Sequence, residues 1–324
     1  MRRRIFMGGG LCGVGAALYA RGVMAQAAGG AMRVIFPFAA GGPGDALSRL
    51  VADAIGAAEG RAGIVENRTG ADGRIGIQAV KNSGGNGDTL LVTTGPTMWL
   101  MPIVHAAPGY DPVKDFAPVS LLARFDFCLA VANNSGVGAI ADFPGWLKAN
   151  PQKASYGIPG LGTIPHFIGT RLARLLGVEM VRVVYRGSTP AVNDVISGQI
   201  PIIIVPLSDG LQQHRAGNLR ILAVTGAERS PFLDTVPTLR ESGIDLTGDA
   251  WYALWAPAAT PADQLGRYHG AVVQLLQRSN VKERLSNYGL IAVGSTATEL
   301  AGAMAEATAT WGPVVRETGF RIEQ

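Results

Sequence analysis

A strand, a glycine-rich turn and a helix follow one another in residues 34–56, and this order is the strongest constraint on the fold. The apolar run 34–38 predicts a buried strand, the turn 39–44 breaks it, and apolar residues then recur at helical spacing from Leu47. A helix that begins after such a turn presents free backbone N–H groups and its positive dipole end, which favour an anion. A turn without a ligand is the alternative, because similar turns occur throughout α/β folds. Asp45 stands at the helix start, where we expect it to cap the helix without contacting a cation.

The composition is that of a globular chain. Its 324 residues suggest about two domains, and a charged fraction of 16% argues against disorder. The formal net charge of +4 arises at the N-terminus, because residues 1–27 hold four of the 28 Lys and Arg residues and no acid. The remaining basic residues balance the 24 acidic ones, so we expect no nucleic-acid partner. Only Cys128 lies beyond residue 27, which excludes an intrachain disulfide there.

The N-terminal segment, residues 1–27, is predicted to be an export signal. Arg3 and Arg4 resemble a twin-arginine motif, an apolar run follows from 8 to 20, and residues 25–27 form a small-x-small cleavage site. The run is too short to span a membrane, so we expect no span in the mature chain. The mature chain then lies in a bacterial periplasm. The twin-arginine route is favoured, and general secretion is the alternative.

Strands and helices alternate in the first third of the chain. Residues 63–67 and 89–94 are predicted strands, separated by a helical pattern over residues 75–80. This alternation predicts a parallel, doubly wound sheet, in which ligands bind at the carboxyl ends of the strands. The turn 39–44 and the strand end at 93–95 then lie at one edge of the sheet, which favours a ligand over an empty turn.

A second α/β unit repeats this arrangement. Glycine-containing turns at 160–166 and 186–191 each follow a predicted strand and open a predicted helix. Three such turns in two units predict two lobes that face each other across a cleft. A C-terminal segment that returns to the first lobe gives two crossings between the lobes, and hence a hinge. The other predicted elements are strands at 119–122, 127–131, 155–157, 180–185, 200–205, 219–225 and 251–256, and helices at 141–149, 264–277 and 298–317, the last with a weak capping box at 295–298.

No catalytic or metal-binding motif is found in the sequence. It lacks the G-x-S-x-G turn of hydrolases and the phosphate-binding P-loop, and its four histidines lack metal-ligand spacing. We therefore expect no metal, no cofactor and no enzymatic activity. His166 lies on a predicted site turn, and Arg186 is placed to meet an anion unless it is a solvated loop arginine. Trp251, Tyr252 and Trp255 are expected to pack in the core rather than stack on a ligand.

Several sequence blocks occur in the order found in one family. They are VIFPFAAGGPGD, VENRTGADG, YDPVKDFAPVSLLA, YGIPGLGTIPH, VYRGSTPAVNDVISGQI, LRILAVTGAERSPFLDTVPTLRESGI and APAATPAD. Together they strongly resemble the tripartite tricarboxylate transporter substrate-binding family, also called the Bug receptors, over nearly the whole mature chain. The resemblance implies an α/β periplasmic-binding-protein fold (type II) with two lobes, each a mostly parallel sheet flanked by helices, and a two-stranded hinge. Lobe 1 is then formed by residues 28–127 and 227–324, and lobe 2 by residues 128–226.

The resemblance also implies a function. Such a protein is an extracytoplasmic receptor that captures a small carboxylic acid in the interlobe cleft, largely through backbone N–H groups and ordered water. It delivers the acid to membrane transporter subunits of the tripartite tricarboxylate type, and we expect it to be a monomer. A sensory protein that reports its ligand to a membrane signalling partner needs the same cleft and is the second interpretation. A secreted enzyme on the same fold is the third.

Four turns supply the ligand site when the family's site is carried over residue by residue. Turn amides at helix N-termini suit a buried carboxylate, because they satisfy its lone pairs without a paired cation. The implied ligand-binding residues are Phe38, Ala40, Gly41, Gly42 and Asp45 in the first turn, Thr93, Thr94 and Gly95 at the third strand, Gly160, Gly162, Thr163 and His166 in the next turn, and Arg186, Gly187, Thr189, Pro190, Ala191 and Asp194 in the last.

Two departures from the family's pattern bear on the ligand. Asp72 stands where the family usually has glycine, which predicts a stiffer loop or a local negative charge. Pro201 and Val205 stand at two acidic positions of the family. The change at Val205 is expected to make one wall of the cleft more apolar and to favour an aromatic or aliphatic acid over a highly polar polycarboxylate.

Overall fold

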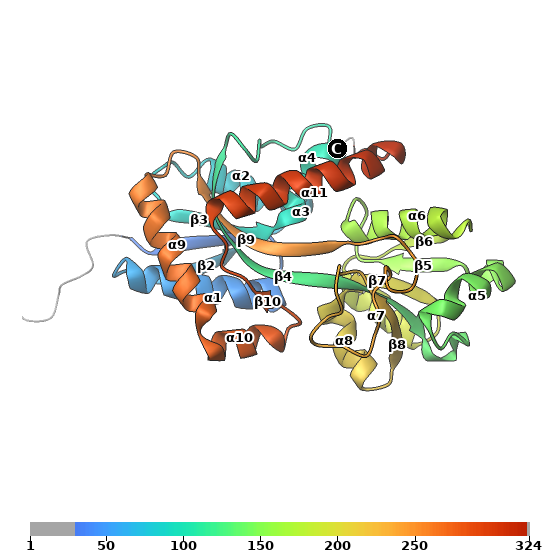
Figure 1. The fold of residues 1–324 in the computed structure, drawn as a ribbon. Coiled ribbons are helices and arrows are strands. Elements are labelled where there is room, and N and C mark those ends of the chain that lie inside the picture. The colour runs from blue at the N-terminus through green and yellow to red at the C-terminus, as the bar shows by residue number, and fades with distance from the viewer. Residues whose placement is uncertain (1–29, 323–324) are drawn as a thin grey trace, which may run out of the picture.

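Strand β4 (Phe116–Ala132) runs through both halves of the molecule and holds them in one sheet (Figure 1). The computed structural model describes residues 30–322, so the predicted export signal lies outside the described residues. The strand order is β2-β1-β3-β9-β4-β7-β5-β6, and β8 and β10 also pair with β4. The other strands are β1 (Met32–Phe36), β2 (Gly63–Asn67), β3 (Thr89–Thr94), β5 (Ser155–Ile158), β6 (Val181–Val184), β7 (Ile202–Pro206), β8 (Leu219–Val224), β9 (Asp249–Pro257) and β10 (Ile291–Ala292).

The first lobe is built on β1, which lies between β2 and β3 and is parallel to both. Strand β9 joins this sheet antiparallel to β3 and β4. Helix α1 (Pro43–Ala58) buries Leu47, Val51 and Ile55 completely, because their spacing of four residues places them on one face of the helix. The other helices of this lobe are α2 (Arg74–Lys81), α3 (Gly95–Trp99), α4 (Met101–Val104), α9 (Ala262–Gln277), α10 (Ser279–Ser286) and α11 (Ala297–Glu317), with a 3-10 turn η1 (Ala71–Gly73).

The second lobe is built on β5, which is parallel to β6 and β7, while the end of β4 pairs antiparallel with β7 and β8. Val205 on β7 is fully buried in a hydrophobic cluster with Ala191. The expectation that Val205 makes a cleft wall apolar is therefore wrong, because its side chain points into the core of this lobe. The helices are α5 (Phe143–Ala149), α6 (Ile164–Leu176), α7 (Ser188–Ile196) and α8 (Leu207–Arg215), with 3-10 turns η2 (Asn133–Ser135), η3 (Ile140–Asp142) and η4 (Pro151–Lys153).

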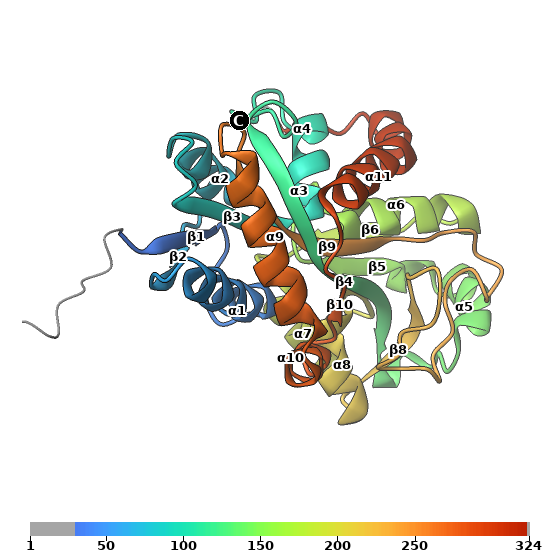
Figure 2. The same ribbon diagram turned by 60° about the vertical axis from the view of Figure 1, so that its left-hand side comes forward.

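The long strand β4 corrects the prediction of two separate strands, 119–122 and 127–131. It is one strand of 17 residues, and Figure 2 shows it running without interruption from beside α9 to beside β8. Up to Asp126 it pairs with β9, and from Phe127 it pairs with β7 and β8. No Gly or Pro breaks the chain after Pro118, so the backbone stays extended while the strand changes partners. The chain crosses between the lobes a second time between β8 and β9.

Several short helices and one short strand were not predicted from the sequence. Helices α3 and α4 have five and four residues, too few to display a helical period, and α8, α10 and β10 also went unpredicted. The capping box of α11 lies at Thr296 and Glu299, whose side chains accept each other's backbone N–H, rather than at 295–298. Within residues 30–322, none of the helices is both long and apolar enough to cross a membrane.

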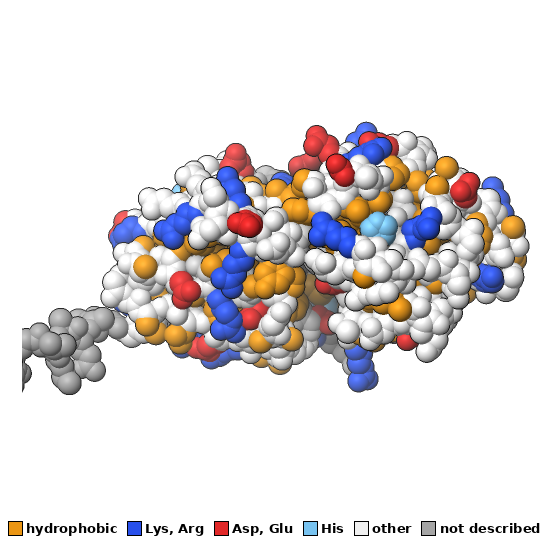
Figure 3. All heavy atoms as spheres, turned by 90° about the horizontal axis from the view of Figure 1, so that it is seen from below, with side chains coloured by type: hydrophobic (Ala, Val, Ile, Leu, Met, Phe, Trp, Pro, Cys, Tyr) orange, Lys and Arg blue, Asp and Glu red, His pale blue; other side chains and the backbone are white. Residues whose placement is uncertain are grey.

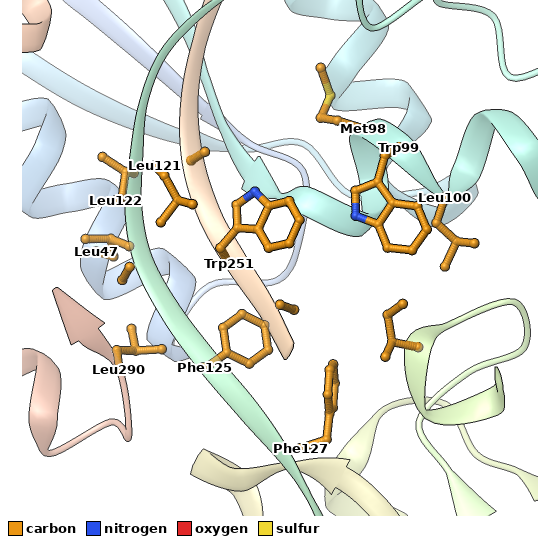
Figure 4. Close-up of a cluster of buried hydrophobic side chains, with 14 of the residues drawn as sticks. Leu47, Met98, Trp99, Leu100, Leu121, Leu122, Phe125, Phe127, Trp251 and Leu290 are labelled. Carbon is orange, nitrogen blue, oxygen red and sulfur yellow. The ribbon is translucent and has the colours of Figure 1, made fainter. Parts of the chain in front are cut away.

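The largest hydrophobic core contains the tryptophans of β9. Trp251 and Trp255 are at most 3% exposed, which confirms their predicted packing role. Figure 4 shows Trp251 beside Phe125, with Phe127 further along β4. A Cβ at Gly95 would lie 2.3 Å from the Trp251 ring, so a glycine is required where α3 begins. The surface is mixed in charge: on the face seen in Figure 3, Lys and Arg side chains are interspersed with Asp and Glu.

The C-terminal segment packs against both lobes. Figure 1 shows α11 lying along the first lobe and reaching toward α6 of the second. Glu317 at its end forms an ion pair of 2.6 Å with Arg174 on α6, and Phe320 packs edge-on against His166, with the ring centres 4.9 Å apart. Ile322 then pairs with His105 in the first lobe. The return of the chain to the first lobe therefore adds a contact between the lobes that is separate from the two crossings.

Candidate functional site

A cleft of about 560 Å³ lies between the lobes, where turns from both meet the crossing strands. This volume suits a small molecule. The lining residues are Phe36, Phe38, Ala39, Gly42, Pro43, Gly44, Asp72, Thr94, Pro96, Thr97, Leu100, Met101, Phe125, Phe127, Pro159, Gly160, Leu161, Gly162, Thr163, Ile164, Pro165, Gly187, Ser188, Pro206, Ser208, Asp209, Ala250, Tyr252 and Leu290. The three glycine-rich turns therefore meet at one place, although they are far apart in the sequence.

The sequence-predicted site residues fall into two groups. Those that line the cleft are Phe38, Gly42, Thr94, Gly160, Gly162, Thr163 and Gly187. Those that do not are Ala40, Gly41, Asp45, Thr93, Gly95, His166, Arg186, Thr189, Pro190, Ala191 and Asp194. Arg186 is exposed, so the one cation expected to meet an anion lies outside the cleft wall, whereas Ala191 is fully buried in the core of its lobe. Asp194 accepts a hydrogen bond of 2.8 Å from the Tyr185 hydroxyl.

Asp45 holds the first turn in place, but it does not cap α1. It is the third residue of the helix, Gly42 is the N-cap, and no side chain forms a capping hydrogen bond there. Its carboxylate accepts instead from the Gly41 N–H at 3.1 Å and from Asn67 Nδ2 at 3.0 Å, and it pairs with Arg49 Nε at 3.0 Å. The prediction that it contacts no cation is therefore wrong. Burial raises the pKa of Asp45, but the hydrogen bonds from Asn67, Arg49 and Gly41 outweigh burial and hold the pKa below its usual value.

His166 faces away from the cleft, into a hollow between α6 and α11. Its Nδ1 accepts a hydrogen bond of 3.2 Å from the Gly162 N–H, and its Nε2 lies 2.6 Å from Arg182 Nη1. Burial and the charge of Arg182 lower the pKa of His166 to about 4, so the ring is neutral at neutral pH. His166 thus supports the turn that lines the cleft from behind.

An aromatic wall forms one side of the cleft, and sequence analysis missed most of it. Ring centres lie 6.3 Å apart for Phe36 and Tyr252, 5.2 Å for Tyr252 and Phe125, and 5.7 Å for Phe125 and Phe127. Figure 4 shows Phe125 and Phe127 projecting toward the same side of β4, as alternate residues of a strand do. Tyr252 packs as expected and also faces the cleft. The signal in the sequence is the alternation Arg-Phe-Asp-Phe at the point where β4 changes lobes.

Four helices of nine or more residues begin at the cleft. They are α1, α6, α7 and α8, with the N-cap residues Gly42, Thr163, Gly187 and Pro206, all of which line the cleft. None of these N-caps forms a side-chain capping hydrogen bond, so first-turn N–H groups remain available to a ligand. The exceptions are Pro43, Pro165 and Pro190, which have no N–H, and His166, whose N–H donates to the Thr163 carbonyl. The four dipoles also place their positive ends there. The site therefore favours an anion through backbone groups.

The polar side chains of the cleft include two carboxylates and no cation among the described lining residues. Asp72 extends from the η1 turn with its side chain 62% exposed. Asp209 lies in the first turn of α8, where burial raises its pKa and hydrogen bonds with Ser188 and Ser208 lower it in part. Within residues 30–322, no group of three or more His, Cys, Asp or Glu side chains is arranged to hold a metal ion.

The chain is similar to known proteins over most of its length. Residues 47–320 match the model of a family described as tripartite tricarboxylate transporter family receptor. The chain is 30% identical to a UPF0065 protein encoded in the tcbD–tcbE intergenic region of Pseudomonas sp. (strain P51), with 90% of this chain and 87% of that protein covered. It is 28% identical to protein BugT of Bordetella pertussis, with 90% of each covered.

Solved structures have the same fold. A periplasmic transporter protein is 34% identical, with a TM-score of 0.80 and with 91% of this chain and 99% of that chain covered. A Rhodopseudomonas palustris protein solved with adipate is 28% identical, with a TM-score of 0.81 and coverage of 90% and 98%. MatC from the same organism, solved with malate, is 27% identical, with a TM-score of 0.77 and coverage of 88% and 98%. The two-lobed periplasmic-binding-protein fold predicted from sequence is thus confirmed.

Proposed function

Because the chain belongs to the tripartite tricarboxylate transporter receptor family, we propose that it captures a small carboxylic acid between its lobes and delivers it to a tripartite tricarboxylate-type membrane transporter. The observation that carries this proposal is the convergence of four helix N-termini on a cleft whose described lining residues include no cationic side chain. Similar proteins solved with adipate and malate support a carboxylate as the ligand class. The receptor works as a monomer and carries out no catalysis.

The carboxylate is held by backbone amides. A buried carboxylate is costly unless its lone pairs are hydrogen-bonded, and N–H groups at helix ends meet this need without a counter-ion. The seven predicted residues that line the cleft supply these contacts. The other predicted residues act indirectly, as Asp45 does by accepting the Gly41 N–H. The aromatic wall favours an acid with an apolar body.

Closure around the ligand requires two bodies that move. In our proposal these are residues 28–127 with 227–324, and residues 128–226. The crossing on β4 near Asp126 and the segment between β8 and β9 are the hinge.

A ligand screen tests the carboxylate proposal. Thermal shift over mono-, di- and tricarboxylates and aromatic acids is expected to raise the melting temperature with at least one acid, and isothermal titration calorimetry then gives its affinity. The matched amides, which keep the shape and lose the charge, are the control. Stabilisation by amides and acids alike would contradict binding through anion recognition.

The site of action is proposed to be the periplasm, with the export signal removed near Ala27. N-terminal sequencing of protein recovered from the periplasm of an expressing bacterium is expected to begin close to residue 28. An intact Met1 on that protein would contradict the proposed cleavage.

A further inference from the structure

Asp209 is an acidic residue placed in the wall of a site that favours anions. It lies in the first turn of α8, on the second lobe, and lines the cleft. The Ser208 hydroxyl donates to its Oδ1 at 3.2 Å, and Ser188 also hydrogen-bonds to it. Both partners are neutral. Within residues 30–322, none of the ion pairs involves Asp209.

The groups around Asp209 leave its charge uncompensated. Two titratable residues, Tyr252 and Cys128, lie close enough to Asp209 to be affected by its charge. Burial, together with the negative charge of Asp209, raises the pKa of each well above its usual range. Both are therefore neutral at neutral pH. The dipole of α8 stabilises a carboxylate in its first turn, but only weakly. A carboxylate on the solvent-exposed side of the helix would gain the same stabilisation, so the dipole does not explain why Asp209 lines the cleft. A half-buried charge without a cationic partner is costly, so the missing partner is expected to come with the ligand.

The neighbouring wall also suits a cation. Tyr252, whose ring pairs with that of Phe125 at 5.2 Å, faces the same cleft, and aromatic faces attract ammonium groups. We propose that Asp209 is a specificity-determining residue that pairs with a protonated amine of the ligand, so that the cargo is an amino acid rather than a simple carboxylic acid. This inference rests on the proposed function, because the carboxylate of the same molecule occupies the amides at the helix N-termini.

Matched pairs of ligands test the inference directly. Isothermal titration calorimetry at pH 7 compares L-glutamate with glutarate, L-phenylalanine with 3-phenylpropionate, and 5-aminopentanoate with pentanoate. In at least one pair the amino member is expected to bind tighter by about tenfold or more, the size of a hydrogen bond to a charged group. Asp209→Asn is expected to remove this preference while retaining affinity for the amine-free acid.

The control is Asp245→Asn, which removes a carboxylate that is 92% exposed and lies outside the cleft lining, and it is expected to keep the preference. A structural role of Asp209 at the start of α8 would change stability without changing the preference, so the melting temperature of each variant is recorded alongside. The comparison of amino and amine-free ligands on wild-type protein needs no variant. It therefore tests the preference for an amine even if Asp209→Asn folds poorly.

The outcomes separate this inference from the proposed function. If amine-free acids bind as tightly as their amino partners, or if the preference survives in Asp209→Asn, Asp209 is not a cation site although the carboxylate receptor stands. If phenethylamine binds, loses affinity in Asp209→Asn, and no acid binds, the cation site stands and the carboxylate function is wrong. If none of these probes binds, both are overturned.

Discussion

Two acidic residues, Asp45 and Asp126, have roles that follow from where their charge is placed. Asp45 is 4% exposed yet remains ionised because three hydrogen-bond partners surround it. Asp126 lies directly opposite Asp249 on the two strands that pair where β4 leaves the first lobe. Its pKa is raised to about 6 by burial and by the charge of Asp249, which Arg124 offsets in part. Asp45 therefore stabilises the turn 39–44, whereas Asp126 destabilises the crossing on β4 at neutral pH.

Replacing Asp45 is expected to weaken both stability and binding. Asp45→Ala leaves the Gly41 N–H without its acceptor and leaves the Asn67 amide with only the Phe38 carbonyl, which costs about 2–3 kcal/mol in the free energy of unfolding. The turn 39–44 then loses its brace, so affinity for the acid found in the screen falls as well. Urea denaturation and titration calorimetry measure the two effects. Arg49→Ala is the control, because the Arg49 side chain is 52% exposed and its loss is expected to cost less than about 1 kcal/mol.

Replacing Asp126 is expected to change how stability depends on pH. An unfolded Asp has a pKa of about 3.9, and the folded pKa is higher, so the folded state holds the proton more tightly. The stabilisation from this group is complete below pH 4 and is lost as the pH rises through about 6. Asp126→Asn should therefore exceed wild type by about 1–3 kcal/mol at pH 8 and match it near pH 4. Urea denaturation at several pH values measures this, with Asp245→Asn, whose side chain is 92% exposed, as the control. Parallel pH profiles for wild type and Asp126→Asn would refute the assignment.

At the scale of elements, the segment after α11 supports a cleft turn that it does not itself line. Phe320 packs on His166 and Phe167, and His166 accepts the Gly162 N–H. A Cβ at Gly162 would lie 3.1 Å from the Phe320 ring, so the turn and the C-terminal segment are in close contact. The geometry of the turn at Gly162 therefore depends on Phe320, which lies 158 positions later in the chain.

Phe320→Ala is expected to lower ligand affinity although the side chain is outside the cleft. Removing the ring withdraws packing from His166 and loosens the Gly162 turn, at a cost of about 1–3 kcal/mol in stability. Titration calorimetry and thermal denaturation measure the two changes. Arg174→Ala is the control, since it removes only the exposed ion pair with Glu317 and should leave affinity unchanged. Unchanged affinity in Phe320→Ala would show that the segment does not support the site.

At the scale of the whole molecule, the cleft belongs to neither lobe alone. Its lining comes from turns of both lobes and from the strands that cross between them. Ligand binding is therefore expected to shift the population toward a closed arrangement. Ala191 is unsuitable for testing closure by adding bulk, because it is fully buried and a large side chain would disrupt the core of its lobe. Leu161, which lines the cleft and is 41% exposed, can accept bulk without that cost.

Leu161→Trp is expected to block closure and leave the unliganded fold intact. In small-angle scattering, the cognate acid should reduce the radius of gyration of wild-type protein but not that of the variant. The affinity of the variant should fall in parallel, while its melting temperature without ligand stays close to wild type. Equal compaction and equal affinity in the two proteins would show that closure does not involve this turn.

Local patterns in the sequence predicted much of the framework. Strands 63–67 and 89–94 have the predicted bounds, because a buried strand between turn signals is read from a short window. The glycine-rich turns were also identified, since a strand, a turn and a helix are contiguous in the chain. The sequence blocks that resemble the receptor family predicted the two-lobed fold correctly. These features depend on residues that are near neighbours in the sequence.

The tertiary structure decided which side chains face the cleft. Tyr252 and Phe125 form one wall because β9 and β4 pair antiparallel, and no local pattern reveals that pairing. The role of His166 was likewise decided by packing. Its ring lies against Phe320 and accepts the Gly162 N–H, so it supports that turn from behind. Asp209 went unpredicted because its place in the cleft wall depends on residues that are far apart in the sequence. Local sequence is enough to specify the turns that can bind an anion. Long-range packing specifies which side chains surround the anion, because burial and orientation depend on contacts between distant segments.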